Sequence, residues 1–264
     1  MTYEEKKAAY LDLVTEIRNG ERLSECNSSS VSFEACKKCE EINLWTYWQG
    51  GIDCLDAEIV LMGQDWGTYD QQLIDEWIPY FENRRKLSPE KYPHPKVYSK
   101  ADTDYRLVQL FKSIDPKLDI QHKIYHNLFF TNFILYYRSP SSENSQSGGN
   151  INPAMRIFSH YNARLMEIIE PKVVICLGRS TFDSTMKALG YTPPKGNYNT
   201  LIEHGELEIK IAQNKCVVFP VAHPGGLGVA NRNRGKTYND PLDIQRQDWN
   251  KIGIYLKKHE ISII

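Results

Sequence analysis

Glu58-Ile-Val-Leu-Met-Gly63 is the stretch that decides the fold, because it is a short apolar run that ends in a glycine. Such a run is typical of a strand that is buried on both faces of a parallel sheet. Similar runs occur at Asn127 to Phe133, Lys172 to Gly178 and Cys216 to Val221. The sequence therefore predicts four buried strands.

Amphipathic helical patterns alternate with these strands. They cover Gln71 to Arg84, Thr103 to Ile114, Asn152 to Ile169, Ser180 to Leu189 and about Pro241 to Lys258, and a first helix runs from Thr2 to near Gly20. This alternation predicts an α/β fold, a three-layer α/β/α sandwich around a central, mostly parallel sheet. Because we find no repeat and no linker, we expect one domain over 1–264, with a Cys-rich insertion at about 21–56.

The composition is that of an ordinary globular protein. The 264 residues carry 32 Lys and Arg against 33 Asp and Glu, and 41% of them are hydrophobic. These values exclude collagen-like and disordered chains, and no stretch reaches the roughly 20 apolar residues of a membrane span. The start of the chain also lacks the apolar core of a secretory signal. We therefore expect a cytoplasmic monomer that does not enter a membrane.

Polar or glycine-rich motifs follow three of the predicted strands. Gly63-Gln64-Asp65-Trp66-Gly67 follows the first strand, Asn132 ends the second, and His223-Pro224-Gly225-Gly226-Leu227 follows the last. Ligands of open parallel sheets bind at the carboxyl ends of the strands. We therefore expect the carboxylate of Asp65, the amide of Asn132 and the imidazole of His223 to converge on one site.

This ordered set of motifs, over about residues 58–235, resembles the uracil-DNA glycosylase superfamily. The first motif of that superfamily reads GQDPY in its main branch and GEAPG in its iron-sulphur branch, and its last reads HPS before a leucine-bearing loop. The resemblance implies an enzyme, a monofunctional DNA glycosylase that hydrolyses the N-glycosidic bond of uracil or a 5-modified pyrimidine in DNA and leaves an abasic site. DNA is then the expected partner, and the role is DNA repair or attack on modified foreign DNA.

The resemblance also implies a role for each residue in base excision, whose transition state separates a cationic sugar from an anionic base. Asp65 would stabilise the cation and orient or activate the water, and His223 would donate a hydrogen bond to the base. Asn132 would pair with the base edge, and Leu227 would fill the gap in the DNA helix. The pocket would be lined by Gly63, Gln64 and Trp66, with Tyr98 as the stacking aromatic and Trp77, Tyr80 and Phe81 as its rivals. Arg232 and Arg234 would hold phosphates, and Gly225 and Gly226 would lie against the DNA.

Two motif positions depart from the superfamily. Gly67 stands where the main branch has a tyrosine that abuts C5 of uracil. Either the pocket tolerates a 5-substituent, or Trp66 or Tyr69 supplies the exclusion. Gly225 replaces the serine of HPS, which usually contacts phosphate.

Four cysteines lie in the N-terminal quarter, at Cys26, Cys36, Cys39 and Cys54. One CxxC pair and two further thiols are enough for a tetrahedral site, so we expect a structural zinc ion, with an iron-sulphur cluster as the alternative. The iron-sulphur branch has a cysteine at the position where this chain has Tyr136, so that cluster cannot form here as it does there. Reduced cysteines that bind no metal are the third possibility.

Two other functions fit the same residues. One is a non-catalytic protein of the same fold that binds DNA or a base. The other is a hydrolase of small-molecule N-glycosides, for which the basic residues near Arg232 and Leu227 itself would be incidental. A comparison of a free nucleoside with an oligonucleotide substrate separates these functions from the glycosylase.

Overall fold

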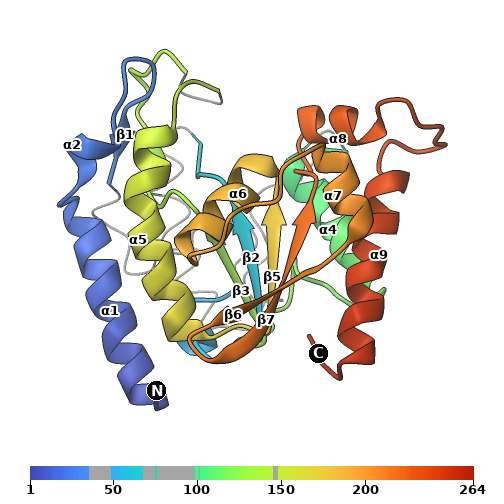
Figure 1. The fold of residues 1–264 in the computed structure, drawn as a ribbon, viewed down its shortest axis with the longest axis horizontal. Helices are drawn as coiled ribbons and strands as arrows, with labels where there is room; N and C mark the ends of the chain where they lie inside the picture. Colours follow the sequence, from blue (N-terminus) through green and yellow to red (C-terminus); the bar gives the residue numbers. More distant parts are fainter. Residues whose placement is uncertain (36–48, 68–74, 76–98, 101, 145–147) are drawn as a thin grey trace.

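The structure is a computed structural model in which residues 1–35, 49–67, 75, 99–100, 102–144 and 148–264 are described. At the centre of this part lies a five-stranded sheet with the strand order β3-β2-β5-β7-β6 (Figure 1). The strands are β2 (Ile59–Gly63), β3 (Leu128–Asn132), β5 (Val173–Leu177), β6 (Leu207–Ile211) and β7 (Asn214–Val221). All four predicted strands are present and run parallel, whereas the edge strand β6, which we did not predict, is antiparallel to β7.

Helices cover both faces of the sheet (Figure 1). One face carries α4 (Thr103–Ile114) and α9 (Asp243–Lys258), and the other carries α5 (Asn152–Ile169) and α6 (Arg179–Ala188), with α1 (Tyr3–Asn19) against α5. Successive strand side chains point to opposite faces, so Ile59 and Leu61 join the α4–α9 core while Val60 and Met62 join the α5 core. The α/β class and the mostly parallel sheet are confirmed.

The predicted helix limits agree closely with the structure. Thr2 and Glu5 form the capping box at the start of α1, and Gly20, in the left-handed conformation, ends it. The limits of α4 and α5 are those predicted. α6 differs by one residue at each end, and α9 differs by two residues at its amino end. The helix predicted over Gln71 to Arg84 lies almost entirely outside the described residues.

The loop after β3 is fastened to the N-terminal segment. β1 (Phe33–Glu34) pairs with β4 (Tyr137–Arg138). Beyond β4, the main chain of Asn144 donates to the carbonyl of Ser30 at 3.2 Å, and that of Asn150 donates to the Ser30 hydroxyl at 3.0 Å. At Gly149, where φ is +69°, an added Cβ would lie 2.4 Å from the side chain of Val31. The described residues of this loop, 139–144 and 148–152, are thus packed on residues 28–34.

Three short helices complete the described fold and were not predicted: α2 (Leu23–Cys26), α7 (Tyr198–His204) and α8 (Gly226–Asn233), beside the 3₁₀ turn η1 (Ile52–Cys54). We predicted a glycine-rich loop where α8 begins, and that prediction was wrong. Glycine disfavours helix, but the buried side chains of Val229 and Asn233 pack the helix in place, and packing overrides propensity. Among the described residues, none of the helices is long and apolar enough to cross a membrane.

Candidate active site

A cavity of about 760 Å³ opens at the carboxyl edge of the sheet. It lies at the ends of the neighbouring strands β2 and β5. From β2 the chain leads to β3 on one side, and from β5 it leads to β7 on the other side. Ligands of open α/β folds bind where the connections diverge in this way. Asp65, Asn132 and His223 all line it. The three side chains that we expected to converge therefore share one cavity, although 158 residues separate the first from the last in sequence.

Asn132 is the last residue of β3, and it pairs in register with Gly63 at the end of β2. The side chain is only 2% exposed, and its Oδ1 has no hydrogen-bond partner among the described residues. A buried polar atom without a partner costs about 1–3 kcal/mol of stability. An oxygen kept at this cost beside a cavity is suited to accept a hydrogen bond from a ligand.

His223 follows β7 and is held by a glycine-rich turn. The main-chain N–H of Gly225 donates to Nδ1 at 2.9 Å, so Nδ1 is unprotonated and the neutral ring carries its proton on Nε2. Burial lowers the pKa of the imidazole, and the negative charge of Asp65 offsets part of this effect. An added Cβ at Gly228 would lie 2.0 Å from the carbonyl oxygen of His223. The neutral ring therefore offers Nε2 as a hydrogen-bond donor.

The carboxylate of Asp65 forms a buried ion pair that we did not predict. Arg138 donates from Nε to Oδ1 at 3.2 Å and from Nη2 to Oδ2 at 2.8 Å. The main-chain N–H of Gly67 donates to Oδ1 at 2.9 Å, and Nε2 of Gln64 donates to Oδ2 at 3.0 Å. A carboxylate accepts about four hydrogen bonds. In this arrangement, Asp65 has no acceptor site left for a water molecule.

The remaining predicted base-binding residues fall into three groups. Gln64 and Trp66 line the cavity, and the ring of Trp66 lies 6.3 Å from that of Tyr137. Gly63 ends β2 beneath the cavity and is not among the residues that line it. Tyr98 lies outside the described residues, as does Tyr69.

Part of the predicted DNA-binding surface is present beside the cavity. Gly225 and Gly226 lie at the start of α8, and both line the cavity. Leu227 follows them, with 81% of its side chain exposed. Arg234 is exposed just beyond the helix and donates to the side chain of Asn231.

The prediction that Arg232 holds a phosphate is corrected by the structure, because the side chain of Arg232 lies in the interior. The side chain is 2% exposed and donates to Asp248 through Nε at 2.7 Å and Nη2 at 2.9 Å. Its Nη1 donates to Glu203. The helical turn of α8 points this arginine at α9, so Arg232 fastens the two helices together.

Of the four cysteines that we expected to hold a metal ion, Cys26 and Cys54 lie in the described part of the chain. Cys54 lies beside the first turn of α1, since the hydroxyl of Tyr3 donates to the carbonyl of Ile52. Cys26 lies beyond the other end of α1, a helix of 17 residues and therefore about 25 Å long. Two sulphurs bound to one zinc ion are less than about 5 Å apart, and the described structure does not bring these two thiols together in that way.

The thiol of Cys26 is buried, and this burial raises its pKa to about 12. Cys36 and Cys39 lie outside the described residues. Within the described part of the chain, no three His, Cys, Asp or Glu side chains are grouped closely enough to hold a metal ion.

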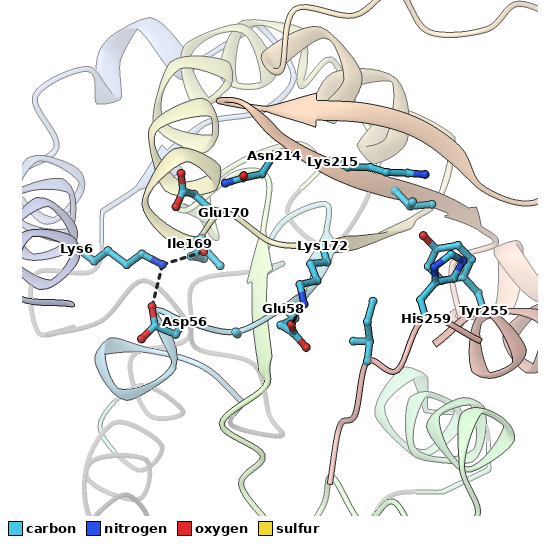
Figure 2. Close-up of a pocket in the computed structure, with 13 residues that line it drawn as sticks. Lys6, Asp56, Glu58, Ile169, Glu170, Lys172, Asn214, Lys215, Tyr255 and His259 are labelled. Carbon is cyan, nitrogen blue, oxygen red and sulfur yellow. Dashed lines mark hydrogen bonds and ion pairs between the residues drawn. The ribbon is translucent and has the colours of Figure 1, made fainter. Parts of the chain in front are cut away.

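A second cavity, of about 590 Å³, lies at the amino edge of the sheet (Figure 2). Its lining is rich in charges, but these charges are largely paired with one another. Lys6 donates to Asp56 at 2.8 Å and to the carbonyl of Ile169 at 3.2 Å, and Lys172 pairs with Glu58. These pairs join the ends of helices and strands, so we take the cavity at the carboxyl edge as the candidate active site.

Comparison with models of protein families found no match, and comparison with curated proteins found none.

Proposed function

We propose that the protein is a DNA glycosylase that hydrolyses the N-glycosidic bond of uracil or a 5-modified pyrimidine in DNA and leaves an abasic site. One observation carries this proposal: Asp65, Asn132 and His223 come from the ends of three strands and line a single cavity. The order and types of these residues are similar to those of the uracil-DNA glycosylase superfamily.

The proposed chemistry assigns the departing base to Asn132 and His223. As the glycosidic bond breaks, negative charge grows on the base, and a donor placed at a carbonyl oxygen stabilises that charge. The Nε2–H of His223 is such a donor, and a donor of this kind contributes about 3 kcal/mol. The unpartnered Oδ1 of Asn132 accepts from an N–H on the edge of the base.

The sugar is assigned to Asp65. The negative charge of this carboxylate, whose side chain is only 7% exposed, favours the cationic sugar of the transition state. Because four hydrogen bonds already fill its oxygens, we assign Asp65 an electrostatic role and do not assign it proton abstraction from water.

The DNA backbone is assigned to the start of α8. Main-chain N–H groups at the amino end of a helix attract phosphate, and the exposed Arg234 adds positive charge nearby. The exposed Leu227 between them has the position and the apolar side chain needed to occupy the space left by an everted nucleotide. Action as a cytoplasmic monomer is part of the same proposal.

A panel of oligonucleotides tests the proposal. Single-stranded and double-stranded substrates carry uracil, mismatched thymine, 5-hydroxymethyl pyrimidines or larger 5-substituents, and free nucleosides serve as the small-molecule comparison. We expect excision from DNA and none from nucleosides. Release of base from nucleosides alone would instead identify a small-molecule N-glycoside hydrolase.

A second candidate is a protein that binds an everted base without cutting DNA. The ion pair between Asp65 and Arg138 favours it, because Arg138 neutralises the charge that would stabilise the cationic sugar. In that case the protein binds modified DNA more tightly than unmodified DNA, and every oligonucleotide in the panel stays intact.

A structural metal ion held through Cys36 and Cys39 also remains a proposal. Elemental analysis of the purified protein tests it directly. One equivalent of zinc, lost when both cysteines are replaced by serine, is the expected result, and metal-free protein would exclude the ion.

A further inference from the structure

We propose that Arg138 is a positioning residue that acts through Asp65, holding the carboxylate of Asp65 fixed at the cavity from a support built by the N-terminal segment. This inference rests on the proposed glycosylase function, and it adds a residue that the motifs do not include.

The geometry of Arg138 is that of a fixed fork. The side chain is 1% exposed, and two of its nitrogens point at the two oxygens of Asp65. The third, Nη1, donates to the carbonyls of Asn144 and Gly148 at 2.9 and 2.7 Å. A planar guanidinium with all three nitrogens engaged cannot turn without breaking several charge-assisted hydrogen bonds. The direction of the Asp65 carboxylate is therefore set by Arg138.

The main chain reinforces the same contact. The N–H of Arg138 donates to the carbonyl of Gly67 at 2.8 Å, and the N–H of Gly67 donates to Asp65. Residues 65, 67 and 138 thus form a closed set of hydrogen bonds at the wall of the cavity. A shift of Arg138 would be passed directly to the carboxylate.

The support for Arg138 comes from a distant part of the chain. β4, which carries Arg138, pairs with β1, and the next residue, Ser139, donates from its main chain to the carbonyl of Ser32 at 2.8 Å. The Ser139 hydroxyl donates to Glu34 at 2.6 Å. The carbonyls that accept from Nη1 belong to the loop packed on residues 28–34. The N-terminal segment therefore contributes to the site without lining the cavity.

The test uses single-turnover excision by the full-length protein. Arg138→Gln removes the charge and the fork, and Arg138→Lys keeps the charge alone. Arg164→Gln is the matched control, because Arg164 forms a bidentate pair with Glu16 that joins α5 to α1. Each variant is also made in an Asp65→Asn background, and thermal unfolding and DNA binding are measured for all of them.

We expect Arg138→Gln to slow excision about 100-fold, the effect of a misplaced catalytic group, with DNA affinity within about threefold of wild type. The excision rate of Arg138→Lys should fall between the rates of Arg138→Gln and wild type, and the rate of Arg164→Gln should match wild type. In the Asp65→Asn background, Arg138→Gln should change the rate less than about threefold, because both changes remove the same effect.

A second experiment distinguishes a positioning role of Arg138 from a purely structural one, and it measures whether an added guanidinium compound restores excision. Methylguanidinium should restore the rate of Arg138→Ala at least about tenfold and leave Arg164→Ala unaffected. A folded Arg138→Gln variant with the wild-type rate, or equal losses in the two backgrounds, overturns this inference alone. A wild type that excises no base overturns the proposed function, and the inference with it.

Discussion

The main-chain N–H of Gly225 lies 2.9 Å from Nδ1 of His223 and donates a hydrogen bond to it. This contact places the proton of the neutral ring on Nε2. We predict that ¹⁵N NMR of imidazole-labelled protein will show His223 as the Nε2–H tautomer at neutral pH. His223→Ala should slow excision about 100- to 1,000-fold while DNA binding changes little. A ring protonated on Nδ1 would contradict the role given to His223.

The pH dependence of stability gives a second prediction. His223 has a lowered pKa in the folded protein, so below about pH 6.5 the unfolded chain binds more protons at this residue. Its contribution to stability is therefore complete above that pH and is lost as the pH falls. We expect the free energy of unfolding to decrease on acidification by up to about 1.4 kcal/mol per pH unit more in wild type than in His223→Gln. Urea denaturation of both proteins between pH 8 and 5 measures this difference. The same pH dependence of the free energy of unfolding in both would refute the lowered pKa of His223.

The buried amide of Asn132 should be needed for excision but should not add to the stability of the protein. Asn132→Leu removes a buried oxygen that has no partner in the described structure, so the free energy of unfolding should stay within about 1 kcal/mol of wild type or rise. Excision should be lost. Asn162→Leu is the control, because the Oδ1 of Asn162 is likewise buried without a partner among the described residues, whereas its Nδ2 donates to the carbonyls of Phe133 and Phe158. Loss of these two hydrogen bonds should cost about 1–3 kcal/mol. If Asn132→Leu is the less stable variant and remains active, Asn132 is structural.

Leu227 is tested by comparing two exposed apolar side chains. Leu227→Ala should slow excision from double-stranded DNA about tenfold, with little effect on single strands, because only a duplex leaves a gap to fill. Ile254→Ala, on α9, is also exposed and should have no effect on excision. Both variants should keep their stability within about 0.5 kcal/mol. Equal effects on the two kinds of DNA would remove Leu227 from the proposed interface.

Local patterns predicted much of the fold. The apolar run at Glu58 to Gly63 and the capping box at Thr2 each carry enough information in a few residues to define an element. The rule that ligands bind at strand ends predicted that Asp65, Asn132 and His223 would meet in one cavity. β6 was missed although Leu207, Ile209 and Ile211 alternate with charged residues, a pattern that a search for buried strands overlooks.

The features of the site that we did not predict depend on contacts between residues that are distant in sequence. Arg138 and Asp65 are 73 positions apart, and their pairing follows from the packing of the loop after β4 on the N-terminal segment. Arg232 belongs to a basic run that resembles a solvated surface, yet α8 turns it toward Asp248.

The most direct measurement is single-turnover release of base from the oligonucleotide panel by wild type and by Asp65→Asn, with DNA binding measured in parallel. We predict that wild type releases uracil or a 5-modified pyrimidine and leaves an abasic site. Asp65→Asn should bind the same DNA but release base at least about 100-fold more slowly. Intact DNA after incubation with wild type, or equal rates for the two proteins, would contradict the account.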